Sequence, residues 1–166
     1  RDSQENSVVI GTALDLSSKV GGEFYVGYMK RDFDSTQYNN ISSVTYGADL
    51  LWNINRLTSV EVAVERTIEE TTAANAAAYV NNGASVSLEH ELQRNVLLGG
   101  FVSVADHEYK GISREDSYIA TGVEARYLIN KTFSVGVGYD YTRRDSNVAG
   151  NDYGNNQIML KLTGSF

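Results

Sequence analysis

The 166-residue sequence contains no cysteine and no proline. Without cysteine there is no disulfide framework, no thiolate zinc site and no cysteine nucleophile. The absence of proline suits long, uninterrupted strand ladders. The sequence also lacks any run of about 18 apolar residues, which excludes a transmembrane helix. The formal net charge of -7 argues against nucleic acid as a partner.

In place of long apolar runs the sequence has alternation. The last eleven residues, 156–166, read N-Q-I-M-L-K-L-T-G-S-F. One parity is apolar and ends on an aromatic residue: Ile158, Leu160, Leu162 and Phe166. This period of two predicts a strand with one apolar and one mostly polar face. Without a hydrophobic helix, strands of this kind can cross a membrane only as a barrel.

Eight further segments alternate in the same way. They cover about residues 8–16, 23–33, 44–52, 60–65, 84–92, 96–107, 119–127 and 133–142. Residues 1–6 are polar and unpatterned, so we expect them to be disordered or a loop remnant, with residues 7–166 forming one all-β domain. Residues 73–78 could form a helical turn, but so short a segment is not stable alone.

A basic residue recurs in the short turns. These residues are Lys19, Arg56, Arg94 and Lys131, with spacings of 37, 38 and 37. A constant period marks a repeated structural unit. Two membrane-crossing strands of about 11 residues, one tight turn and one longer loop add up to this length. The pattern predicts an antiparallel, up-and-down transmembrane β-barrel with its short turns on the periplasmic side.

Aromatic residues are expected near the short-turn ends of the apolar faces. There they would form the girdle of a membrane barrel: Phe24, Trp52, Tyr127, Phe133 and Phe166. The alternative is a soluble β-sandwich, whose strands also alternate. A sandwich explains neither the repeat nor the aromatic residues at strand ends.

The expected strand number is odd, whereas closed single-chain bacterial barrels have an even number. We therefore expect the chain, which begins at Arg1, to be the C-terminal part of a larger barrel. No secretory signal peptide is visible.

The stretch N-K-T-F-S-V-G-V-G-Y-D-Y and the terminal aromatic residue carry a family resemblance. Over essentially its whole length the chain resembles the β-barrel porin type 2 family of Gram-negative bacteria. Gly164 departs from the outer-membrane pattern, which often has an aromatic or apolar residue there. The resemblance implies the bacterial outer membrane with its lipid, and the barrel assembly machinery as a partner of the C-terminal strand. That family is often linked with exopolysaccharide production, which makes polysaccharide a candidate cargo beside small solutes.

Acidic residues dominate the polar parity of the strands, which would face the barrel interior. The predicted pore-lining acids are Asp15, Asp49, Glu61, Glu65, Glu89, Glu91, Glu124 and Asp140, with Glu23 beside them. The basic residues predicted on the same face are Arg126 and Lys161. Buried charges need partners or water. The interior is therefore either a water-filled pore with a cation-favouring field or a plugged wall whose acids pair with further bases.

These patterns favour a porin-like diffusion or export channel, with a structural scaffold barrel as the alternative and an outer-membrane hydrolase third. A hydrolase needs a nucleophile and a positioned base. His90 shares the lipid-facing parity, and His107 is expected in a charged rim beside Asp106 and Glu108. No catalytic residue, cofactor or metal site is predicted, and the transported substrate is left open.

Overall fold

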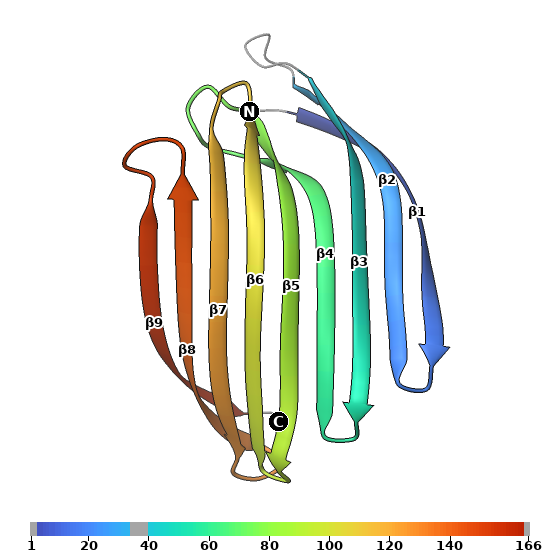
Figure 1. Cartoon of the computed structure of the whole chain (residues 1–166), viewed down its shortest axis with the longest axis vertical. Helices are drawn as coiled ribbons and strands as arrows, with labels where there is room; N and C mark the ends of the chain where they lie inside the picture. The colour runs from blue at the N-terminus through green and yellow to red at the C-terminus, as the bar shows by residue number, and fades with distance from the viewer. Residues whose placement is uncertain (1–2, 34–39, 165–166) are drawn as a thin grey trace.

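The structure is a computed structural model that describes residues 3–33 and 40–164 as one antiparallel sheet of nine strands (Figure 1). The strands are β1 (Ser3–Ser17), β2 (Val20–Phe33), β3 (Ile41–Asn55), β4 (Thr58–Glu70), β5 (Ala78–Gln93), β6 (Val96–Lys110), β7 (Glu115–Leu128), β8 (Phe133–Ser146) and β9 (Tyr153–Gly164). Each strand pairs with the next along the chain. The described ranges contain no helix, and so none that could cross a membrane. The expected all-β, up-and-down architecture is confirmed.

The connections alternate in length. Two-residue turns follow β1, β3 and β5, and four residues follow β7, whereas four to seven residues separate the strands at the opposite end. We call these the short-turn end and the long-loop end. The bases Lys19, Arg56, Arg94 and Lys131 all lie in the short turns, as predicted. The repeat in the sequence therefore corresponds to one hairpin and its connection.

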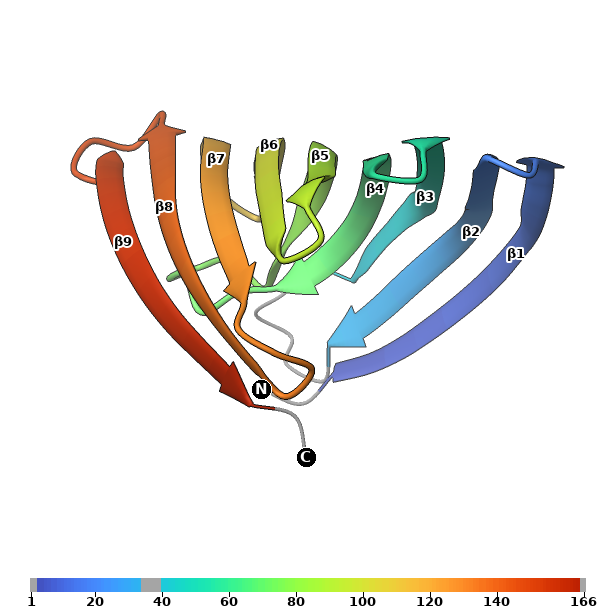
Figure 2. The same ribbon diagram turned by 90° about the horizontal axis from the view of Figure 1, so that it is seen from below.

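The sheet curves into an open trough with β1 and β9 at its edges (Figure 2). These two strands do not pair with each other, so the sheet is not closed in the described ranges. Register shifts lie beside the two-residue turns, between Asp15 and Ser17, Asn53 and Asn55, and Glu91 and Gln93. Bulges at such positions increase the local twist of a strand pair.

The trough has two chemically different faces, because successive side chains of a strand point to opposite sides. The convex face carries the predicted apolar rows, and these rows are open: Val8 is 79% exposed, Ile10 75% and Leu160 82%. The concave face carries the acids and most of the small polar residues. A contiguous apolar surface of this extent is not typical of a soluble monomer.

Buried apolar packing is concentrated at the long-loop end. There Ile41, Ile68, Ala78 and Val80 form a cluster, against which Met29 packs. At this end the two ends of the loop 71–77 are joined by a backbone hydrogen bond of 3.2 Å from Thr71 N to Ala77 O. Residues 73–77 form a bend and turn rather than a helical turn, with Asn75 in the left-handed region at φ 62°.

The start of the chain differs from the expectation. Residues 3–6 belong to β1, so the prediction that residues 1–6 are disordered or a loop remnant is wrong for them; residues 1–2 lie outside the described ranges. Glu5 pairs with Arg31 in register and through an ion pair. Arg31 also lies 3.1 Å from Glu70 on β4. Alternation cannot reveal a strand that is polar on both faces, which explains the error.

Candidate functional site

Four of the predicted acids surround one cavity on the concave face. Glu61 of β4, Glu89 of β5, Glu124 of β7 and Asp140 of β8 line a hollow of about 510 Å³. The strand register explains why Glu89 and Glu124 line the same cavity, because Glu89, Gly99 and Glu124 lie opposite one another on three adjacent strands. The Glu124 side chain lies over Gly99, where an added Cβ atom would come within 3.0 Å of Glu124 Cγ.

Two more acids line a second cavity nearer the long-loop end. Asp49 and Glu65 belong to this hollow of about 390 Å³. Asn81 Nδ2 donates a hydrogen bond of 2.9 Å to Glu65 Oε1. The ring of Tyr25 lies over Gly47, where a Cβ atom would collide with it. An aromatic ring covering a glycine on the neighbouring strand is a known way to fill a curved sheet.

Asp15 and Glu91 are not gathered into either cavity. Asp15 lies opposite Gly21 at the short-turn end of the edge strand β1. Glu91 lies opposite Leu97, close to the turn between β5 and β6. The structure therefore brings six of the eight acids together in two groups. That all eight line a pore remains a prediction.

Few basic side chains form ion pairs with these acids. Arg126 Nη2 lies 3.4 Å from Glu89 Oε2, and this is the single ion pair of the eight acids within the described part of the chain. Lys161, the other predicted base, lines a neighbouring hollow with Arg126 and has no ion pair there. The concave wall thus carries a net negative charge. Among the described residues no group of three or more His, Asp or Glu is placed to hold a metal ion.

A row of four aromatic rings and one arginine crosses the concave face toward the long-loop end. We call it the aromatic rim; it consists of Tyr79, His107, Tyr118, Arg144 and Tyr153. The His107 ring stacks on Tyr79 with centroids 4.3 Å apart and tilts against Tyr118 at 4.5 Å. The Arg144 guanidinium carbon lies 6.0 Å from the Tyr118 centroid and 4.7 Å from that of Tyr153. These distances fit stacking and cation–π attraction.

Sequence reasoning missed the aromatic rim because it sought aromatic residues on the apolar parity alone. Tyr118, Arg144 and Tyr153 lie opposite one another on β7, β8 and β9, in line with Ala105 of the second cavity. Their shared parity with the acids was a usable signal. His107 had been expected in a charged rim, but it lies between aromatic rings.

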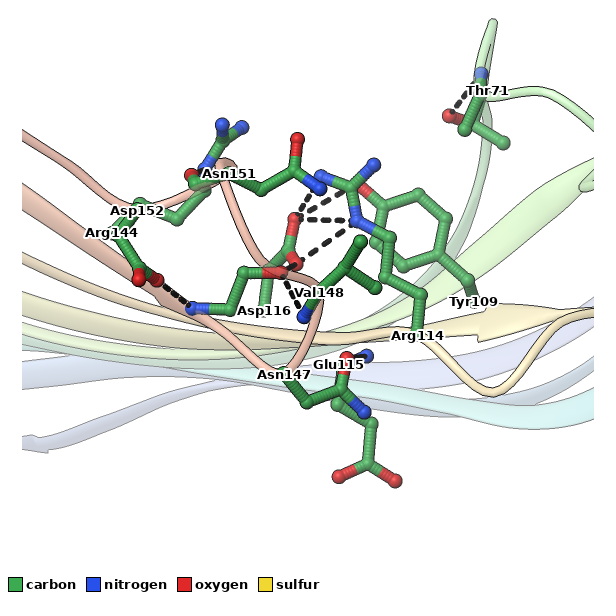
Figure 3. A network of polar contacts seen from close by, with 12 residues as sticks. Thr71, Tyr109, Arg114, Glu115, Asp116, Arg144, Asn147, Val148, Asn151 and Asp152 are labelled. Atoms are coloured by element: carbon green, nitrogen blue, oxygen red, sulfur yellow. Dashed lines mark hydrogen bonds and ion pairs between the residues drawn. The ribbon is translucent and has the colours of Figure 1, made fainter.

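Buried Asp116 joins the loops beside the aromatic rim (Figure 3). Its carboxylate accepts hydrogen bonds from Arg114 Nε at 3.0 Å, from Ser146 Oγ at 2.5 Å and from Tyr109 Oη at 3.3 Å. The hydrogen bonds that Arg114 itself donates to this carboxylate raise the pKa of Arg114 above its ordinary value. Asn147 Nδ2 donates to Ser113 O at 2.9 Å, which ties the last two long loops together.

Four of the predicted girdle residues lie on the convex face at or near the short-turn end. They are between 40% and 48% exposed: Phe24, Trp52, Tyr127 and Phe133. Phe166 lies outside the described residues. On the same face His90 forms a 3.0 Å hydrogen bond with Thr58. Contact of these aromatic residues with a membrane interface stays a prediction.

The comparisons agree with this architecture. A search of curated proteins gave no match. A family model described as "Putative beta-barrel porin 2" matches residues 1–166, which is the whole sequence given. The match covers every strand of the sheet, the acidic concave face and the apolar convex face. The chain therefore belongs to this family of β-barrel porins.

Proposed function

We propose that this chain forms the wall of a water-filled channel in the bacterial outer membrane, which small solutes cross by diffusion and which favours cations. The observation that carries the proposal is the acidic concave wall. Six carboxylates line two cavities there, and one of them has an ion-pair partner among the described residues. Family membership supports the barrel and leaves the solute open.

The convex face supports a place in a membrane. Apolar side chains remain exposed along every strand centre, including Val86, Val102 and Val123 at 48%, 50% and 61%. Removing apolar surface from water is worth roughly 25 cal/mol per Å². Contact with lipid would remove this apolar surface from water. The aromatic residues near the short turns suit the membrane interface.

The concave face supports a hydrated interior. Moving an unpaired carboxylate out of water costs several kcal/mol even after relaxation. The carboxylates of Glu61, Glu124 and Asp140 have no base within ion-pair distance in the described part of the chain. Water therefore solvates them best. Their summed field would concentrate cations in the lumen, more strongly at low salt, where the Debye length grows from about 10 Å at 0.1 M to about 30 Å at 0.01 M.

The reversal potential of single channels tests this proposal. The full chain is reconstituted in planar bilayers under a KCl gradient, and the combined variant Glu61→Gln, Glu89→Gln and Glu124→Gln is compared with it. We expect a cation-biased reversal potential that moves toward zero in the variant while the channel stays open. The shift should shrink as salt rises, because screening removes the field.

A matched control neutralises three acids of the convex parity near the long-loop end: Asp106→Asn, Glu108→Gln and Glu115→Gln. It makes the same change in net charge and should leave the bias nearly unchanged. Absence of conductance in correctly folded protein would reject the channel in favour of a scaffold barrel. An open channel with unaltered bias in the first variant would mean that bases elsewhere neutralise the acids.

The aromatic rim favours polysaccharide as a second candidate cargo. Sugar rings present C–H faces that pack on aromatic rings, and Tyr79, Tyr118 and Tyr153 offer three rings along one row. Current block by a linear glucose hexamer, compared with polyethylene glycol of equal size, tests this idea. Tyr118→Leu should shorten the sugar's blocking events and leave those of the polymer unchanged. Equal blocking by both molecules would remove polysaccharide from the proposal.

A further inference from the structure

A groove opens on the convex face at the short-turn end. Its walls come from β6, β7, β8 and β9, and it has a volume of about 310 Å³. The convex side chains that line it are apolar or aromatic: Val96, Ala125, Tyr127, Val135, Val137 and Leu160. The hollow exists because small Ala125 lies between the larger Leu98 and Val137 in the register. A slot of this kind suits a hydrocarbon chain.

Two unpaired bases lie in short turns that adjoin the strands of the groove. Arg94 precedes the groove residue Val96 by two positions, and Lys131 lies between Tyr127 and Val135. The two turns are held together by a 2.8 Å hydrogen bond from Leu128 N to Asn95 O. Both bases are exposed, and neither has an ion pair or a hydrogen bond among the described residues. Their charges are free to meet an anion.

We propose that the groove with Arg94 and Lys131 is a binding site for one anionic phospholipid of the surrounding bilayer. An acyl chain lies in the groove between Tyr127 and Leu160, and the phosphate lies at the two bases. The inference rests on the proposed function only in that the convex face must meet lipid. Charge complementarity selects the occupant, since a purely apolar partner would leave both bases without a counter-ion.

The size of the headgroup effect follows from surface electrostatics. A base near an anionic lipid surface contributes about 1 kcal/mol, which corresponds to about fivefold in affinity. Removing both bases should therefore lower the preference for an anionic over a zwitterionic lipid by roughly 25-fold. Filling the groove should act differently, because it lowers retention of the acyl chain whatever the headgroup.

Native mass spectrometry of the full chain from detergent micelles measures this site. The probes are phosphatidylglycerol and phosphatidylcholine with identical acyl chains, added at equal concentration. We expect one phosphatidylglycerol to be retained in preference. Arg94→Gln with Lys131→Gln should abolish the preference, and Ala125→Phe should reduce retention of both lipids. Lys19→Gln with Arg56→Gln removes the same charge from the two other short turns and should keep the preference.

Two results would overturn the inference. One is equal retention of both lipids by the unaltered chain. The other is an equal loss of preference in the control pair, which would reduce the effect to net charge at the membrane surface. Conductance of the same samples separates this inference from the proposed function: an open channel without lipid preference rejects the lipid site alone, whereas lipid retention without conductance rejects the channel alone.

Discussion

Arg126 of β7 reaches past β6 and places its Nη2 atom 3.4 Å from Oε2 of Glu89 on β5. Gly99 of β6 lies between Glu89 and Glu124 and adds no side chain to the space that the contact crosses. One base thus neutralises part of the acidic cavity wall. Because both partners are partly exposed, water and salt weaken the pair, so its effect on the local charge matters more than its effect on stability.

Removing this base should therefore strengthen cation selectivity. In Arg126→Gln the Glu89 carboxylate loses its counter-charge, and the cation-biased reversal potential at low salt should increase. Arg143→Gln is the matched control, because Arg143 pairs with Asp145 on the convex parity. It should leave the bias unaltered. An unchanged cation bias in Arg126→Gln would show that the cavity does not face the conduction path.

The two faces of β6 should tolerate charge very differently. Val102 lies near the strand centre on the convex face and is 50% exposed, whereas adjacent Ser103 lines the second cavity. Val102→Arg should destabilise the membrane-inserted protein by about 2 to 4 kcal/mol, as expected for a base at the bilayer midplane. Ser103→Arg should be destabilising by far less. Urea unfolding in liposomes measures both, and similar losses would contradict a lipid-facing convex surface.

Sequence alternation predicted the strand order and the assignment of residues to faces because one apolar face makes parity visible. It failed at residues 3–6, which are polar on both sides, yet Gln4 still pairs with Asp32. It also made the strands too short at the long-loop end. There β7 begins at Glu115, four residues before the expected segment 119–127.

The candidate site was only half predictable, for a physical reason. Parity identifies acids that share a face, but register decides which of them meet; Glu89 meets Glu124 across Gly99, whereas Asp15 stays apart at the edge. The contact of Asp116 with Ser146 also follows from register, because the two residues lie opposite each other on β7 and β8. Its contact with Arg114 depends on how the loop 111–114 folds over the strand end, and such a contact has no periodic signature in a sequence.

Gly122 is expected to resist substitution. A Cβ atom there would collide with the Phe101 ring and with the Asp140 carboxylate on the two neighbouring strands. Overpacking of this kind costs about 1 to 3 kcal/mol, so Gly122→Ala should lower the unfolding free energy by that amount. Gly100→Ala is the control, since its Cβ would approach Gly122 O at an ordinary 3.5 Å. Equal stability of the two variants would mean that Phe101 does not rest on Gly122.

The ion pairs Arg114–Asp116 and Arg143–Asp145 have the same sequence spacing but differ in burial. Comparing them tests whether burial of the carboxylate is what holds the long loops in place. Asp116 is 1% exposed and accepts hydrogen bonds from Arg114, Ser146 and Tyr109. Asp116→Asn keeps the shape of the side chain but removes the charge that strengthens these hydrogen bonds. The variant should lose about 1.5 to 3 kcal/mol of stability, as expected for hydrogen bonds to a charged group.

Asp145→Asn changes the corresponding pair with Arg143, in which both side chains are 56% exposed. Solvent already screens that pair, so the substitution should leave stability unchanged within error. Hydrogen exchange provides the local readout. In Asp116→Asn the amides of residues 111–114 and 147–152 should exchange faster, while those of the short turns 94–95 and 129–132 keep their rates. Faster exchange at both ends would indicate global unfolding, and unchanged exchange at the long loops would show that Asp116 does not hold them.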